Sequence, residues 1–246
     1  MRTPLQLYLH IPFCVRKCEY CDFLSQKADE RTQEEYADAL MREISYYASH
    51  TNAYEVTTIF IGGGTPSCLN AQKLCQIMET LYRSFLICAD AEITIECNPG
   101  TLTKEKLELY RKVGINRLSI GLQSADNEEL QILGRIHTYE QFLQTFAMAR
   151  EAGFKNINVD LISGIPYQTT QKFLDTLQKV VQLQPEHISA YSLIVEEGTP
   201  FFEKYEKDRQ RQEAGLVTEI LPTEDETYAI LKATQNYLEK IGYRQY

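Results

Sequence analysis

Hydrophobic and polar positions follow two alternating patterns along this chain. Short runs rich in β-branched and apolar residues alternate with longer stretches in which apolar residues recur at helical spacing. The predicted strands are residues 5–11, 55–61, 91–97, 116–122, 156–162 and 187–193, and the predicted helices lie around 33–49, 71–86, 103–113, 139–152 and 170–183. Strands and helices that alternate in this way predict parallel βα units.

The two faces of the predicted strands differ in polarity. In residues 91–97, Ile93, Ile95 and Cys97 share one face, because alternate positions of a strand point the same way. The same alternation packs the apolar residues under the helices and leaves these residues on the other face: Tyr8, His10, Glu96, Gln123 and Asp160. A closed eight-stranded barrel fills its interior with branched apolar side chains. Six strands with a polar inner face therefore predict an α/β fold, a partial (β/α)6 TIM-like barrel whose lumen holds a polar ligand.

The pattern changes after about residue 196. Residues 203–213 form a dense charge run, which is typical of a solvated helix face or a mobile connection. Thr223 then offers an N-cap for a periodic helix within 221–243. We expect a barrel over residues 1–200 and, over 201–246, a charged connection and helix leading to a C-terminal domain that is missing from the chain.

Composition narrows the class of protein. The chain has 246 residues and a net charge of −9 without a basic stripe, which argues against nucleic-acid binding. Its seven cysteines are an odd number and three crowd one loop, so a disulfide scaffold is disfavoured and a reducing, cytoplasmic compartment is expected. No apolar run approaches the roughly 20 residues that span a bilayer, and the N-terminus lacks the features of a signal peptide.

The crowded loop has the spacing Cys14-x₃-Cys18-x₂-Cys21. A structural zinc site needs four protein ligands, usually as two pairs on separate elements, and no second pair follows downstream. Three thiolates from one loop suit an iron–sulfur cluster in which one iron keeps an open coordination position. A structural or adventitious metal loop remains the alternative.

Unusual segments stand at or near the end of every predicted strand. The first strand leads into the cysteine loop, and the others lead into or carry GGGTPS (62–67), ECNPGT (96–101), GLQS (121–124), DLISGIP (160–166) and SAYSL (189–193). Because barrel active sites are built at the carboxyl ends of the strands, one converging site explains all six segments. The GGGTPS segment lacks the Lys-Ser/Thr of a phosphate loop, and a tight turn is its plainer interpretation.

These segments, together with YLHIPFCVRKCEYCDF, RLSIGLQS, LGRIHT, ISAYSLIVEEGTPF and LPTEDE, resemble the radical S-adenosylmethionine (SAM) superfamily from Tyr8 to about Tyr246. They resemble in particular the HemN/HemW group, which contains oxygen-independent coproporphyrinogen III oxidases (dehydrogenases) and heme chaperones. The resemblance implies that Cys14, Cys18 and Cys21 hold three irons of a [4Fe–4S] cluster and that SAM chelates the fourth. It also implies reductive cleavage of SAM to a 5′-deoxyadenosyl radical.

The resemblance further implies a set of SAM-binding residues. The backbone of the glycine segment would meet the methionyl end, three polar side chains would bind an ammonium group or ribose hydroxyls, Arg135 would clamp the SAM carboxylate, two tyrosines would flank the cluster and the sulfonium, and Ala190 would line the adenine. The full set is Tyr8, Tyr20, Gly63, Gly64, Thr65, Glu96, Gln123, Arg135, Asp160 and Ala190. Taken singly, each has a structural alternative: a turn, a mutual hydrogen-bonded network, or ordinary packing.

Two functions remain open, and no catalytic residue can be named for either. One is a heme chaperone that passes heme to acceptor proteins, and the other is a dehydrogenase that decarboxylates coproporphyrinogen III; both need an electron donor. The dehydrogenase subgroup carries a further Cys two residues after the third ligand, where this chain has Phe23. It also carries a long segment before the cluster motif, which here starts almost at the first residue. Both departures favour the HemW-like interpretation.

Overall fold

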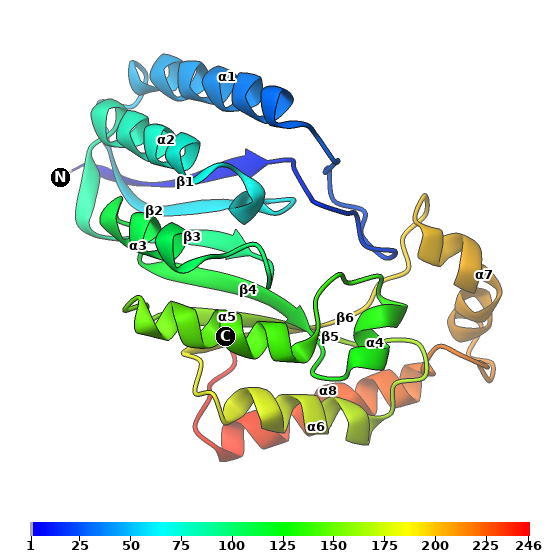
Figure 1. Cartoon of the computed structure of the whole chain (residues 1–246). Helices are drawn as coiled ribbons and strands as arrows, with labels where there is room; N and C mark the ends of the chain where they lie inside the picture. The colour runs from blue at the N-terminus through cyan, green and yellow to red at the C-terminus, as the bar shows by residue number, and fades with distance from the viewer. Residues whose placement is uncertain (1) are drawn as a thin grey trace. The chain divides into compact units, whose positions relative to one another are not determined.

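The computed structural model describes residues 2–246, and its strands form one six-stranded sheet in the order of the sequence (Figure 1). The strands are β1 (Thr3–Ile11), β2 (Tyr54–Gly63), β3 (Ile87–Cys97), β4 (Arg117–Gln123), β5 (Ile157–Ser163) and β6 (His187–Ser192). The β1–β2, β2–β3 and β3–β4 pairs are parallel. Sequential parallel strands joined by helices are the topology of a partial (β/α)6 barrel, so the expected fold class is confirmed.

Most of the helices fall where the sequence pattern predicts them. They are α1 (Glu30–Ala48), α2 (Ala71–Ser84), α3 (Lys104–Lys112), α4 (Asn127–Ile132), α5 (Tyr139–Glu151), α6 (Thr170–Val181), α7 (Pro200–Glu213) and α8 (Glu224–Lys240), with a 3₁₀ turn η1 (Pro66–Cys68). The short helix α4 was not predicted, because six residues are too few to show a helical period. The charge run, for which the sequence left a helix face or a mobile connection open, forms most of α7.

Local signals explain where several helices begin and end. The hydroxyl of Thr103 accepts from the N–H of Lys106 and caps α3. At the start of α8, Thr223 and Glu226 form a reciprocal capping box. Gly114 follows α3 with φ +92°, a left-handed conformation that favours glycine.

The chain forms two compact units. Unit 1 comprises the chain up to Lys17 together with Phe23–Gly121 and Gln141–Asn158, and unit 2 comprises Cys18–Asp22, Leu122–Glu140 and Val159–Tyr246. The cysteine loop contributes to both, since Cys14 belongs to unit 1 and Cys18 and Cys21 belong to unit 2. The expected boundary at residue 200 stays a prediction.

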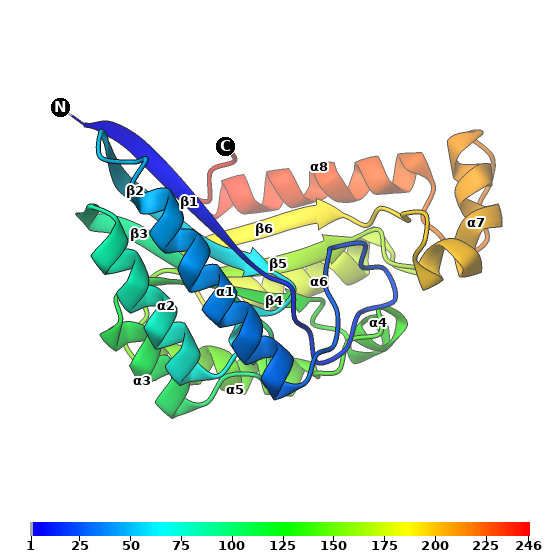
Figure 2. The ribbon, with the colours of Figure 1, turned by 90° about the horizontal axis from the view of Figure 1, so that it is seen from above.

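The core of unit 1 lies beneath its helices. The apolar parity of the strands is buried as predicted, including Ile11, Ile61, Ile95 and Leu118, each with 0% of its surface exposed. Helices α1 and α2 run side by side over this part of the sheet (Figures 1 and 2). On the polar parity, Asn158 donates to the hydroxyl of Ser119 across 2.8 Å. Part of the polar face is therefore a hydrogen-bonded network of the protein itself.

The core of unit 2 includes an apolar cluster around α7. Its buried members are Leu133, Ile162, Ile165, Phe201, Tyr205 and Leu221. The rings of Phe201 and Tyr205 meet edge to face with centroids 5.1 Å apart, and the half-buried Tyr20 packs against Phe201 at 6.3 Å. Helix α6 lies beside α8 (Figure 1). The apolar cluster thus anchors the second half of the cysteine loop through Tyr20.

Candidate functional site

The three cysteines of the loop carry free thiols, like the other four cysteines of the chain. Over residues 2–246, no three His, Cys, Asp or Glu side chains gather into a set that could hold a metal ion. The thiolates of an iron–sulfur cluster bind different irons, so their arrangement need not resemble a mononuclear site. The assembly of Cys14, Cys18 and Cys21 around one cluster therefore stays a prediction.

In unit 1, the glycine segment after β2 lies directly against Cys14. The N–H groups of Gly64 and Thr65 donate to the carbonyls of Ile11 and Phe13 across 2.9 and 2.7 Å. A Cβ atom on residue 64 would lie only 2.7 Å from the Phe13 oxygen and 3.0 Å from the Cys14 sulfur. Glycine is needed here because the backbone approaches the cysteine segment too closely for any side chain.

Glu96 closes the same segment from β3. Its carboxylate accepts the N–H of Gly63 across 2.9 Å. The N–H groups of Gly63, Gly64 and Thr65 are therefore all used within the protein. Carbonyl and carboxylate oxygens are acceptors, the type of group that an ammonium requires.

Tyr8 and His10 extend from β1 toward the end of the cysteine loop. The Nε2–H of His10 donates to the carbonyl of Leu24 across 2.9 Å, since a carbonyl only accepts. His10 Nδ1 is then the acceptor for the hydroxyl of Tyr8 at 3.0 Å. Partial burial and the charge of Glu96 raise the pKa of Tyr8. His10 thus has a structural role, because it links Tyr8 of β1 to the backbone of Leu24.

The sequence did not predict the polar network that Asn98 and Lys106 form around residues 65–67. Asn98 Nδ2 donates to Thr65 Oγ1 across 2.8 Å, and the Thr65 hydroxyl lies 3.5 Å from Cys14 Sγ. The Nζ of Lys106 donates to the carbonyl of Ser67 across 2.8 Å, and burial lowers the pKa of this lysine. The signal was present in the ECNPGT segment, from which only Glu96 was singled out.

In unit 2, Arg135 is directed at the second cysteine. Its Nη1 lies 3.5 Å from Cys18 Sγ. Burial disfavours the charged guanidinium, but the neighbouring Tyr20 and Cys18 outweigh it, so the pKa of Arg135 is raised. Burial also raises the pKa of Tyr20, although the positive charge of Arg135 opposes this effect. Arg135 and Tyr20 thus both lie next to Cys18.

Glu19 is clamped between two helices of unit 2. Its N–H donates to the carbonyl of Leu133 after α4, across 3.2 Å, and its carbonyl accepts the N–H of Phe201 in α7, across 3.1 Å. A Cβ atom on Gly134 would come within 2.6 Å of the Glu19 side chain. The backbone between Cys18 and Cys21 is therefore held by the end of α4 and the start of α7. Sequence reasoning did not single out Glu19, because its side chain carries no periodic or motif signal.

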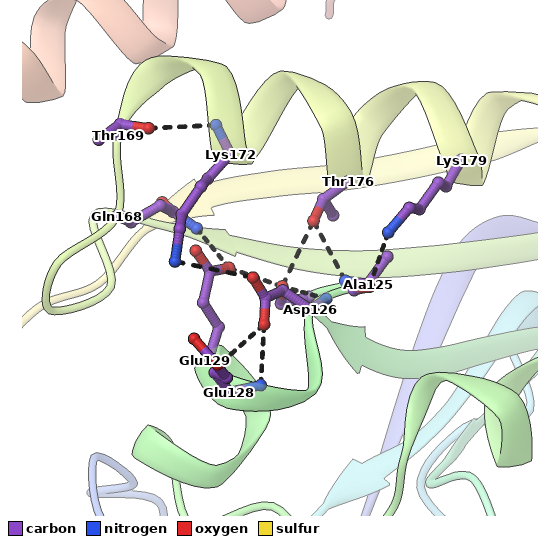
Figure 3. A network of polar contacts seen from close by, with 10 residues as sticks. Ala125, Asp126, Glu128, Glu129, Gln168, Thr169, Lys172, Thr176 and Lys179 are labelled. Carbon is purple, nitrogen blue, oxygen red and sulfur yellow. Dashed lines mark hydrogen bonds and ion pairs between the residues drawn. The ribbon is translucent and has the colours of Figure 1, made fainter.

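Helix α4 is itself held by a buried polar network, drawn in Figure 3. Glu129 is 1% exposed, and its Oε2 accepts from Ser124 at 2.6 Å and from Gln168 at 2.9 Å. Burial raises the pKa of Glu129, while these two hydrogen bonds oppose the shift. Lys172 of α6 pairs with Asp126 at 3.7 Å (Figure 3). The network ties the loop after β4, helix α4 and helix α6 together and so fixes the segment that carries Arg135.

The remaining predicted residues of unit 2 lie on β4, β5 and β6. Gln123 is buried with φ +73°, a strained conformation for a residue with a side chain, and its Oε1 accepts the hydroxyl of Tyr191 across 3.4 Å. Asp160 is half-buried and Ala190 is exposed. Strained backbone is common at functional sites, so of these three residues Gln123 has the strongest structural support for a role in binding.

Comparisons with known proteins identify the family. Residues 8–180 match the model of the radical SAM superfamily. The chain is 36% identical to the heme chaperone HemW of Escherichia coli (strain K12), over 99% of this chain and 61% of that protein. It is also 36% identical to the heme chaperone HemW of Bacillus subtilis (strain 168), over 96% of this chain and 63% of that protein.

A solved structure of a radical SAM enzyme also matches the chain. The coproporphyrinogen III oxidase HemN from Escherichia coli, a radical SAM enzyme, superimposes with a TM-score of 0.85 at 32% identity, over 99% of this chain and 54% of that chain. The chain thus spans less than two thirds of the length of the relatives it matches. Because the family model matches residues 8–180, which are most of the chain, the chain belongs to the radical SAM superfamily.

Proposed function

We propose that the chain is part of a heme chaperone of the HemW type, which holds heme for transfer to acceptor proteins. The observation that carries this proposal is the 36% identity to HemW proteins over nearly the whole chain. Phe23 adds local support: it is 70% exposed and stands where the dehydrogenase subgroup carries a further cysteine. Because the chain spans 61% of the Escherichia coli protein, the activity of the whole protein belongs to this proposal.

Membership of the radical SAM superfamily implies a [4Fe–4S] cluster and SAM. The residues present fit both groups. Three free thiols on one loop supply soft ligands for iron, and the glycine approach to Cys14 leaves no room for a side chain against that sulfur. When bound, the reduced cluster supplies one electron to the sulfonium of SAM. We propose Cys14, Cys18 and Cys21 as the cluster ligands.

The proposed SAM contacts follow the two units. In unit 1, Gly63, Gly64, Thr65 and Glu96 would bind the methionyl end through backbone and carboxylate oxygens, with Tyr8 beside them. In unit 2 the proposed contacts are Tyr20, Gln123, Arg135, Asp160 and Ala190. Arg135 has two candidate tasks, because its guanidinium reaches Cys18 and also has the fork geometry that suits a carboxylate.

Within residues 2–246, no helix is long and apolar enough to cross a bilayer. We propose a cytoplasmic, reducing environment, because the seven cysteines are an odd number and three of them crowd one loop. An electron donor and heme-accepting proteins complete the proposed partners.

The alternative is a coproporphyrinogen III oxidase that produces protoporphyrinogen IX. It is favoured by the structural match to HemN at a TM-score of 0.85. The two functions make different demands: an oxidase turns over a porphyrinogen, whereas a chaperone binds heme and releases it to a partner.

The test combines cofactor assembly with a functional assay. The natural full-length protein, reconstituted without oxygen, is expected to contain iron and sulfide, and Cys18→Ala is expected to lose most of both. Cys88→Ala, which removes a cysteine outside the loop, is the matched control. Stoichiometric heme binding without turnover of coproporphyrinogen III would support the chaperone. Formation of protoporphyrinogen IX would overturn it in favour of the oxidase.

A further inference from the structure

The hydroxyl of Thr65 has three polar neighbours: the amide of Asn98, the sulfur of Cys14 and the thiol of Cys68. Asn98 Nδ2 lies 2.8 Å away and Cys14 Sγ lies 3.5 Å away. The amide nitrogen of asparagine only donates, so it occupies a lone pair of the Thr65 oxygen. Thr65 is 3% exposed, which limits competition from water. A neutral thiol such as that of Cys68 is a weak acceptor, whereas the thiolate of a cluster ligand is a charged one, so the single hydroxyl proton goes to the sulfur of Cys14.

We propose that the Thr65 hydroxyl, oriented by Asn98, donates a hydrogen bond to the Cys14 sulfur and raises the reduction potential of the cluster. This inference rests on the proposed function, in which Cys14 is a cluster ligand. Reduction adds one electron and makes the cluster and its thiolates more negative. A hydrogen-bond donor at a ligand sulfur stabilises the reduced form more than the oxidised form, so the potential rises.

The surroundings of Thr65 keep this donor in place. Its backbone N–H is bonded to the carbonyl of Phe13, immediately before Cys14, and its carbonyl accepts the N–H of Cys68 across 2.8 Å. The backbone N–H of Asn98 donates to the Ser67 hydroxyl across 3.3 Å, so this hydrogen bond joins the loop after β3 to the segment after β2. Because hydrogen bonds already fix both the backbone and the side chain of Thr65, its hydroxyl loses little conformational freedom when it binds the sulfur. Thr65 is thus a positioning residue for the cluster, in addition to its proposed place beside SAM.

The test is a redox titration of the anaerobically reconstituted full-length protein with dithionite, followed by electron paramagnetic resonance in the absence of SAM. Thr65→Val keeps the branched shape and removes the hydroxyl. It is expected to lower the equilibrium constant for reduction three- to tenfold, a downward shift of about 30–60 mV at 59 mV per tenfold. Thr65→Ser is expected to stay close to wild type. Thr145→Val removes an equally buried hydroxyl, bonded to Gln141 within α5, and is expected to leave the potential unchanged.

The possible outcomes separate this inference from the proposed function. A Thr65→Val protein with a full complement of iron and an unchanged midpoint would overturn the inference alone. A wild-type protein that takes up no iron and sulfide would overturn the cluster assignment and this inference with it. If Thr65→Val retains no cluster, Asn98→Leu decides, because it keeps the hydroxyl but removes the amide that orients it. A lowered midpoint in Asn98→Leu supports the inference, and an unchanged one overturns it.

Discussion

Arg135 donates from Nη1 to the sulfur of Cys18 across 3.5 Å. A hydrogen bond from a charged donor to a thiolate is stronger than one between neutral groups. The sequence resemblance assigns Arg135 to the SAM carboxylate, whereas the structure directs it at a proposed cluster ligand. The two tasks predict different behaviour when SAM is absent.

If the contact with Cys18 acts on the cluster, Arg135→Gln lowers the midpoint potential even without SAM. The loss of a positive charge beside the sulfur disfavours the reduced cluster, and we expect a shift of at least about 59 mV, which corresponds to tenfold in the equilibrium constant. Arg150→Gln in α5 is the control. An unchanged midpoint combined with weaker SAM binding would instead assign Arg135 to the SAM carboxylate alone.

Gly134 lies so close to Glu19 that there is no room for a side chain at position 134. Gly134→Ala places a side chain at φ +72° and within 2.6 Å of Glu19, whereas Gly215→Ala meets only the backbone conformation, φ +66°, with nothing within 4 Å. We expect Gly215→Ala to lower the free energy of unfolding by about 1–2 kcal/mol and Gly134→Ala by about 2–5 kcal/mol, because overpacking adds to the backbone strain. Urea denaturation of the cluster-free chain measures both.

Iron retention adds a second measurement for the same pair of variants. A side chain at position 134 would collide with Glu19, which lies between Cys18 and Cys21. We therefore expect Gly134→Ala to lose iron to a chelator faster than Gly215→Ala. Equal iron loss from the two variants would show that the clamp does not hold the cysteine loop.

Residues on periodic elements were predictable from the sequence, and residues in buried polar networks were not. The alternation in residues 91–97 places Ile93 and Ile95 in the core because a strand has only two faces. Asn98 and Glu129 act through partners that the tertiary fold brings together, and no sequence period marks them. The direction of Arg135 depends in the same way on the packing of α4, which is too short to be predicted. The cysteine spacing predicts the ligands but does not reveal which side chains surround each sulfur.

Glu129 predicts one dependence of stability on pH. Its pKa is raised by burial, so the folded chain binds its proton more tightly than the unfolded chain does. The free energy of unfolding therefore falls as the pH rises from the ordinary glutamate range through the raised pKa. Glu129→Gln keeps an acceptor for Ser124 and Gln168 and cannot ionise. We expect its stability to lack this fall between pH 4.5 and 7.5, whereas the exposed control Glu128→Gln should retain it.

His137 predicts the opposite dependence. Its Nε2–H donates to the carbonyl of Leu122 across 3.2 Å, and burial together with the charge of Arg135 lowers the pKa of His137 to about 3. The unfolded chain, with an ordinary histidine pKa of about 6.5, binds the proton first as the pH falls. The contribution of His137 is therefore complete above pH 6.5 and declines by about 1.4 kcal/mol per pH unit below it, until the folded pKa is reached.

The variant His137→Gln isolates this effect, because its amide still donates to Leu122 but does not titrate. Between pH 6.5 and 4.5, the wild-type chain should lose about 2–3 kcal/mol more unfolding free energy than the variant. Urea denaturation of the cluster-free protein at several pH values provides the comparison. Parallel curves for the two proteins would mean that the folded chain takes up the His137 proton as readily as the unfolded chain, which the buried position beside Arg135 disfavours.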